Sequence, residues 1–246
     1  MNSLVARAIL TGLLATAALA AAESVDMAKL GMTAALSPAM RPALVEVPDQ
    51  AGLPRVLLIG DSISIGYTPS VRAHFTGRAN IHRPAENCGP TVLGLARLDS
   101  WLGDGPWAVI HFNFGLHDLK YLDEHGTYVT PDRGHVVANP EQYAQNLRAI
   151  VARLRRTGAR LIFATTTPVP SGALGRVEGS EQAYNSAALR VMQELGVTVD
   201  DLGGYARAHQ AEIQLPHDVH YTPAGYTALG NLVAEAIEKS LHPLKS

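Results

Sequence analysis

Short apolar segments alternate with amphipathic stretches along most of the chain. The short segments are typical of buried strands, and in the longer stretches apolar residues recur at helical spacing. This pattern predicts strands at residues 56–59, 80–83, 108–113, 160–166 and 197–200, and helices at residues 65–76, 91–102, 140–156, 180–195 and 222–240. Strands and helices that alternate in this way form a parallel sheet with helices on both faces and right-handed crossovers. We therefore expect an α/β fold whose ligands bind at the carboxyl ends of the strands.

The first residues form a separate segment. An apolar run of 15 residues, 8–22, follows Arg7 and contains Ala-x-Ala sequences near its end. These features predict a secretory signal peptide over residues 1–22 and hence a secreted or periplasmic protein. An uncleaved anchor helix is the alternative, but the run is shorter than the roughly 20 residues that span a bilayer. After cleavage we expect no stable insertion into a membrane.

Residues 23–54 contain four prolines and little periodicity. They predict an extended N-terminal arm, to which we assign no chemistry. Residues 55–246 then form one domain, because a chain of 246 residues that is 47% hydrophobic and 17% charged has enough apolar material for a single α/β core. The formal net charge is -2 and no basic stripe is visible, which argues against nucleic acid as a partner.

A serine follows the first predicted strand. Residues 56–64 read VLLIGDSIS, which places Ser62 at the carboxyl edge of the sheet, where nucleophiles are found. The tripeptide Gly60-Asp61-Ser62 alone also fits an ordinary strand-to-helix turn in which Asp61 or Ser62 is the N-cap. A nucleophilic serine needs a base. The chain offers His220, in the sequence HDVHYTP just before the last predicted helix.

Two further segments lie between Ser62 and His220 in the chain: NCGPT at residues 87–91 and FNFGLHD at residues 112–118. From about Arg55 to its end, the chain resembles the SGNH hydrolase family, also called GDSL-type esterases, with its serine, glycine, asparagine and histidine blocks. The resemblance implies a three-layer, flavodoxin-like sheet with the serine at the start of a short helix. The G-x-S-x-G elbow of α/β-hydrolases is not matched, because position 64 is serine.

The resemblance also implies an oxyanion hole made by the N–H of Ser62, the N–H of Gly89 and a side chain of the third block. Where the family has the asparagine of G-x-N-D, this chain has His117 in GLHD. Imidazole Nδ1 lies about as many bonds from Cβ as the asparagine Nδ2, so His117 could donate as the Nδ1–H tautomer or as the imidazolium. The alternative is a core histidine and an incomplete oxyanion site. Asp118 is expected to be structural and to bind backbone amides of its loop.

The histidine block departs from the family pattern as well. The family has D-x-x-H, but His217 stands three residues before His220, and Asp218 only two. In an extended segment, residues two apart share a face, so Asp218 could reach the Nδ1–H of His220 and fix its tautomer. We prefer this assignment. The alternatives are that His217 takes the orienting position or that a backbone carbonyl does.

We expect no metal and no cofactor, because the histidines near the site lack a ligand spacing backed by carboxylates or cysteines. Cys88 is the only cysteine, so an intrachain disulfide is impossible, and a small buried residue is expected there. The long polar insertion at residues 120–139 contains Tyr121 and Tyr128 and is typical of a lid or substrate wall. Its polar character favours a hydrophilic ester over a long acyl chain.

These observations predict an exported serine esterase with Ser62, His220 and Asp218 as catalytic residues. The expected substrate is a small-molecule or polysaccharide ester, in particular a short acyl (O-acetyl) ester of a carbohydrate. A lysophospholipase or thioesterase is one alternative. A glycan-binding pseudo-enzyme, in which the altered third and histidine blocks abolish catalysis, is the other.

Overall fold

The computed structural model describes residues 25–34 and 36–242. Its main sheet contains five parallel strands in the order β2-β1-β3-β6-β7: β1 (Arg55–Ile59), β2 (Asn80–His82), β3 (Val109–Phe112), β6 (Arg160–Ala164) and β7 (Thr198–Asp200). This is the flavodoxin-like order, which changes direction between β1 and β3. The expected α/β fold with a parallel sheet is confirmed. The predicted signal peptide, residues 1–22, lies outside the described residues.

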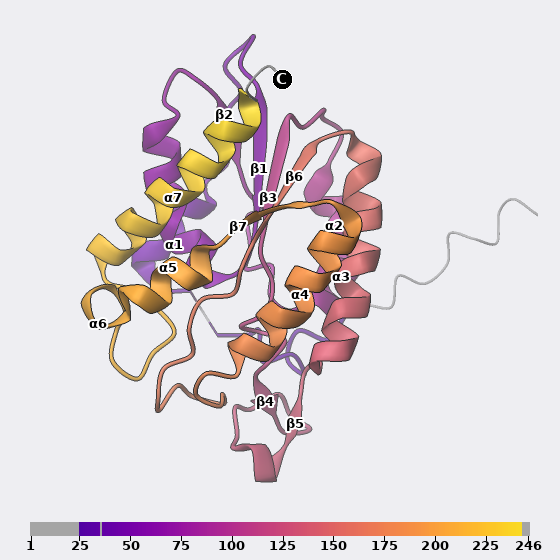
Figure 1. The fold of residues 1–246 in the computed structure, drawn as a ribbon, viewed down its shortest axis with the longest axis vertical. Coiled ribbons are helices and arrows are strands. Elements are labelled where there is room, and N and C mark those ends of the chain that lie inside the picture. The colour runs from indigo at the N-terminus through magenta and orange to yellow at the C-terminus, as the bar shows by residue number, and fades with distance from the viewer. Residues whose placement is uncertain (1–24, 35, 243–246) are drawn as a thin grey trace, which may run out of the picture.

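Helices cover both faces of the sheet (Figure 1). One face carries α1 (Ser62–His74), α5 (Leu202–Ala208), α6 (Gln210–Ile213) and α7 (Pro223–Leu241), and the other carries α2 (Thr91–Leu102), α3 (Pro140–Leu154) and α4 (Glu181–Leu195). The central strands β1, β3 and β6 are mainly apolar, since both faces of a parallel sheet are buried there. In β1, for example, the side chains from Val56 to Ile59 are at most 1% exposed.

The predicted insertion after β3 forms a small hairpin of its own. It pairs β4 (Tyr121–Leu122) with β5 (His135–Val136) in antiparallel fashion, and the 3-10 helix η2 (Pro131–Arg133) lies between them. Figure 1 shows this hairpin projecting beyond one end of the main sheet. A further short 3-10 helix, η3 (Arg155–Thr157), extends α3 to about the predicted end of that helix. The strands β4 and β5 and the helices α5 and α6 were not predicted.

The N-terminal arm is packed onto the domain. Its 3-10 helix η1 (Pro38–Leu44) lies against α1, and the Arg72 guanidinium of α1 donates hydrogen bonds to the carbonyls of Pro42 and Val45 at 3.5 and 3.2 Å. Earlier arm residues, among them Met27 and Met32, pack against the hydrophobic core. Within the described ranges, no helix is long and apolar enough to cross a membrane.

A glycine sets the distance between the two helices that carry the site. A Cβ at Gly66 of α1 would lie 2.1 Å from the ring of Tyr226 in α7, so only glycine lets the two helices approach this closely. The segment that precedes α7 is thereby brought to the beginning of α1. That beginning lies at the carboxyl end of β1, beside the switch between β1 and β3.

Candidate active site

Ser62 is the first residue of α1, three positions earlier than the pattern of apolar residues predicted. The helix begins there because the Asp61 carboxylate caps it and accepts a hydrogen bond from the Ile63 N–H at 2.9 Å. The Ser62 hydroxyl is therefore held at the positive end of the helix dipole. The Ser62 N–H has no acceptor within the part of the chain that the structure describes, and it remains free to bind a ligand.

A continuous chain of hydrogen bonds reaches Ser62 from the loop before α7. The Ser62 Oγ lies 2.9 Å from His220 Nε2, and His220 Nδ1 lies 2.7 Å from Asp218 Oδ1. The Asp218 carboxylate also accepts from the His220 backbone N–H at 3.1 Å. Partial burial acts to raise the pKa of Asp218, but these hydrogen bonds outweigh it and hold the pKa below its usual value. This is the arrangement of a nucleophile, its base and a carboxylate that orients the base.

The histidine loop is fixed at both ends. The Leu215 N–H donates to the His220 carbonyl at 2.9 Å, and the Thr222 N–H donates to the Ile213 carbonyl at 2.9 Å, so the loop is closed like a hairpin. Thr222 then caps α7 through a 3.0 Å hydrogen bond from the Gly225 N–H. These contacts restrict the imidazole position that the reaction requires.

His217 is engaged elsewhere. Its Nδ1 lies 2.8 Å from the Ser171 carbonyl oxygen, and its backbone has a φ of 58°, in the left-handed region. Asp218, His217 and a backbone carbonyl were the three candidates for orienting His220. In the structure, it is the Asp218 carboxylate that lies at His220 Nδ1.

Gly89 lies in the loop before α2, with a φ of 57° that favours glycine. Its N–H, which the family resemblance assigns to the oxyanion hole, donates to the Asn87 Oδ1 at 3.0 Å. This donor becomes available to a substrate only when the Asn87 side chain turns away.

His117 lines the same cavity as Ser62 and is 7% exposed. Burial, with the nearby positive charges of Lys120 and Arg176, holds the pKa of His117 well below its usual value, so its imidazole is neutral. Its Nδ1 lies 3.0 Å from the Lys120 Nζ. An ammonium group only donates, so Nδ1 accepts this hydrogen bond whenever Lys120 is protonated. In that state the proton that His117 can donate is on Nε2 and not on Nδ1, the atom expected from the sequence, because Nδ1 contacts Lys120.

Asp118 has the structural role expected of it, although it binds another loop than its own. Its Oδ1 accepts hydrogen bonds from the backbone N–H and the hydroxyl of Thr91, the first residue of α2. Burial raises the pKa of Asp118 to about 7. The carboxyl group joins the His117 loop to the start of α2, next to Gly89.

A cavity of about 1130 Å³ opens beside Ser62 and His220. The N-terminal arm supplies much of its apolar wall, through Met27, Met32, Leu36, Met40 and Leu44. Leu116, Leu174 and Leu215 face them from the domain, and polar groups of Glu86, Asn87, Tyr128 and Arg176 complete the lining. The prediction that the insertion forms a substrate wall is met at Tyr128. The expectation of an arm without a part in the site is wrong, and its irregular sequence gave no signal of this packing.

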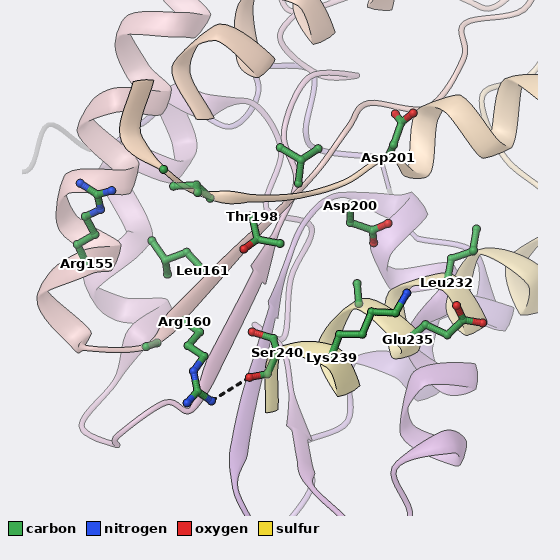
Figure 2. A pocket seen from close by; sticks show the side chains of 15 residues that line it. Arg155, Arg160, Leu161, Thr198, Asp200, Asp201, Leu232, Glu235, Lys239 and Ser240 are labelled. Carbon is green, nitrogen blue, oxygen red and sulfur yellow. Dashed lines mark hydrogen bonds between the residues drawn. The ribbon is translucent and has the colours of Figure 1, made fainter. Parts of the chain in front are cut away.

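A second pocket of about 630 Å³ runs along the edge strand β7 (Figure 2). Charged side chains of both signs surround it: Arg155, Arg160, Asp200, Asp201, Glu235 and Lys239. One of them is tied to the end of α7, since the Arg160 guanidinium donates to the Ser240 carbonyl at 2.8 Å. The pocket contains no paired nucleophile and base, so we place the active site at Ser62.

The remaining candidates for chemistry do not form a site. Cys88 is fully buried, and burial raises the pKa of its thiol to about 12, which leaves it protonated at neutral pH. No group of three or more potential metal ligands occurs among the described residues.

The fold and the hydrogen-bonded serine, histidine and aspartate define a serine hydrolase of the SGNH type. Residues 58–228 match the family model described as GDSL-like Lipase/Acylhydrolase family, and the chain belongs to this family of esterases and acylhydrolases. No curated protein sequence matches it.

Similar solved structures include a lipase/acylhydrolase from Enterococcus faecalis, with a TM-score of 0.62 at 19% identity, covering 79% of this chain and all (100%) of that one. An acetyl xylan esterase has a TM-score of 0.59 at 12% identity and covers 74% of this chain and 99% of its own. A GDSL-like lipase from Bacteroides thetaiotaomicron has a TM-score of 0.58 at 14% identity, with 81% and 95% covered. At these identities the similarity concerns the fold.

Proposed function

We propose that this protein is an exported serine esterase that hydrolyses carboxylic esters through an acyl-enzyme on Ser62. The hydrogen-bond chain from Asp218 through His220 to Ser62 is the observation that carries this proposal. Export rests on the sequence of residues 1–22 alone.

In the first half of the reaction, the Ser62 Oγ attacks the ester carbonyl while His220 Nε2 accepts the hydroxyl proton. The tetrahedral oxyanion receives hydrogen bonds from the Ser62 N–H, from His117, and from the Gly89 N–H once Asn87 has turned away. Collapse breaks the bond to the alcohol oxygen, and the protonated His220 gives its proton to that leaving group. In the second half, His220 deprotonates a water that attacks the acyl-enzyme, and Ser62 is released with its proton restored.

The substrate we propose first is a short acyl ester, in particular an O-acetyl ester of a carbohydrate. The polar groups of Glu86, Asn87, Tyr128 and Arg176 in the cavity lining support a hydrophilic alcohol portion. An acetyl group would need only a small part of the apolar wall.

The methionines of the arm favour a second candidate, an ester with a longer acyl chain of the kind that lysophospholipases and thioesterases cleave. Met27, Met32 and Met40 line the cavity that contains Ser62, and flexible thioether side chains adapt to apolar groups of varied shape. The intact hydrogen-bond chain at Ser62 argues against a glycan-binding pseudo-enzyme.

A chain-length series separates these substrates. We expect the purified protein to turn over p-nitrophenyl acetate, with kcat/KM falling as the acyl chain is lengthened to decanoate. A maximal kcat/KM at octanoate or decanoate would contradict the short acyl ester and support the ester with a longer acyl chain. If the protein cleaved no ester of the series but bound acetylated glycans, the result would support the glycan-binding pseudo-enzyme.

Substitutions at His117 test its part in binding the oxyanion. We expect His117→Ala to lower kcat on the order of 100-fold or more, since alanine supplies no donor. His117→Gln should retain more activity than His117→Asn, because the glutamine amide nitrogen lies as many bonds from Cβ as imidazole Nε2 does. Steady-state kinetics on p-nitrophenyl acetate measure all three variants. Near-wild-type rates in His117→Ala would exclude His117 as a donor.

A further inference from the structure

Lys120 is a buried cation next to the proposed oxyanion donor. Its side chain is 0% exposed. Its Nζ lies 3.0 Å from His117 Nδ1, 3.4 Å from the Tyr128 hydroxyl and 3.8 Å from the Met32 sulfur. No carboxylate among the described residues forms an ion pair with it. Such a cation is costly to bury, so it makes no evident contribution to the stability of the fold.

The position of Lys120 separates it from the substrate. His117 lines the cavity at Ser62, whereas Lys120 does not. The ammonium group therefore acts on the cavity through the side chains that it contacts: His117, whose Nδ1 is the nearest atom at 3.0 Å, and at longer distances Tyr128 and Met32. Arg176, unlike Lys120, lines the cavity itself, and it donates to the carbonyls of Leu116 and Leu174 at 2.9 and 3.2 Å. Direct binding of a substrate anion by Lys120 does not fit this arrangement.

A histidine in the third block can donate to an oxyanion only if its proton is on the correct ring nitrogen, a condition that an asparagine does not have. An asparagine amide always carries N–H groups, whereas a neutral imidazole carries its proton on one of two nitrogens. The proton must be on the nitrogen that faces the substrate. A turn after Gly115, in which the Asp118 and Leu119 N–H groups both donate to the Gly115 carbonyl, brings Lys120 back to His117 three residues earlier.

We propose that Lys120 is a positioning residue that donates to His117 Nδ1, holds the imidazole as its Nε2–H tautomer, and thereby turns His117 into an oxyanion donor. The inference rests on the esterase function proposed above. The positive charge of Lys120, in a site of low dielectric, also strengthens the Nε2–H as a donor when the oxyanion forms. No bond to Lys120 forms or breaks, and its proton stays in place throughout the reaction.

The variant Lys120→Met, of similar length and without charge, tests the proposal. We expect kcat to fall on the order of 10- to 100-fold with little change in KM, less than for loss of a donor. The melting temperature should stay level or rise, because an unpaired buried charge has been removed. Lys239→Met removes an exposed lysine and should match the wild type. A wild-type kcat in Lys120→Met would overturn the proposal, as would a loss of activity that only follows loss of folding.

Two readouts separate positioning from packing. The ¹⁵N NMR signals of His117, identified by their absence in His117→Gln, should show an unprotonated Nδ1 and a protonated Nε2 in the wild type, and a mixture of tautomers in Lys120→Met. In a His117→Ala background, Lys120→Met should have no further effect on kcat. A protonated Nδ1 in the wild type, or additive effects of the two substitutions, would contradict the proposal.

The proposal also predicts a pH dependence. Burial, aided by the positive charge of Arg176, lowers the pKa of Lys120 to about 7, while Asp118 and Asp61 act to raise it. The ammonium is present below this pKa and lost above it. The wild-type kcat should therefore decline as pH rises through about 7, and Lys120→Met should lack this decline. The groups that face Lys120 or act on its charge are His117, Tyr128, Arg176, Asp118 and Asp61.

The variants Ser62→Ala and Lys120→Met test the esterase function and the role of Lys120 separately. If Ser62→Ala retains the esterase rate, the proposed function fails whatever Lys120 does. If Ser62→Ala is inactive while Lys120→Met keeps the wild-type kcat and pH profile, the esterase stands and Lys120 has no part in it.

Discussion

Ser62→Ala should lose esterase activity on the order of 10⁵-fold or more in kcat, with the fold unchanged. The Ser62 hydroxyl is placed to form the acyl-enzyme, since its Oγ lies 2.9 Å from His220 Nε2. Deleting one oxygen removes little packing. The helix cap is also retained, because Asp61 and not Ser62 provides it. Kinetics on p-nitrophenyl acetate and thermal melts measured by circular dichroism check both halves of this prediction.

Ser64→Ala is the matched control. Ser64 is a buried serine of the same helix, two residues further along, and has no contact with His220 among the hydrogen bonds of the structure. We expect it to keep the wild-type rate. If Ser64→Ala were inactive and Ser62→Ala active, the nucleophile would be Ser64 and not Ser62.

Asp218→Asn should lower kcat on the order of 10³-fold or more with little change in KM. The Asp218 carboxylate accepts the Nδ1–H of His220 at 2.7 Å, which leaves Nε2 unprotonated and able to take the Ser62 proton. An asparagine at this position can donate instead, and it would then favour the tautomer with the proton on Nε2. Such a histidine cannot act as the base. The effect therefore falls on the chemical step and not on ground-state binding.

His217→Asn is the control for Asp218→Asn. Asparagine tolerates the left-handed backbone of His217 and removes only the imidazole that binds the Ser171 carbonyl. We expect a small effect on kcat. A large loss of kcat in His217→Asn together with a wild-type kcat in Asp218→Asn would show that His217, and not Asp218, orients His220. If neither substitution mattered, Ser62 and His220 would act as a dyad.

Most of the fold was predictable because its central strands β1, β3 and β6 are buried on both faces. Continuous apolar runs such as Val56 to Ile59 have few other interpretations when amphipathic helices separate them. The places where the prediction differed depend on local polar contacts. The start of α1, for example, was placed at residue 65, because the apolar pattern begins there and does not reveal the Asp61 cap that starts the helix at Ser62.

The site residues whose type indicates their chemistry were predictable from the sequence. Residues whose role depends on how distant segments pack around them were not. Ser62, His220 and Asp218 were identified from residue type and position in the chain, and the structure brings them together. Lys120 begins a polar insertion, where a lysine is ordinarily solvated, and it is buried only because the arm and the β4–β5 hairpin close over it. The donor atom of His117 depends on the contact with Lys120, and residue type alone does not indicate that contact.

Covalent labelling with a fluorophosphonate, followed by mass spectrometry of the peptides, reports directly which serine is the activated nucleophile. A fluorophosphonate reacts with a serine that its base has activated, so it needs no knowledge of the natural ester. We expect a single label on Ser62, no label in Ser62→Ala, and strongly slowed labelling in His220→Ala. A label on Ser64, or labelling that persists in Ser62→Ala, would show that Ser62 is not the nucleophile.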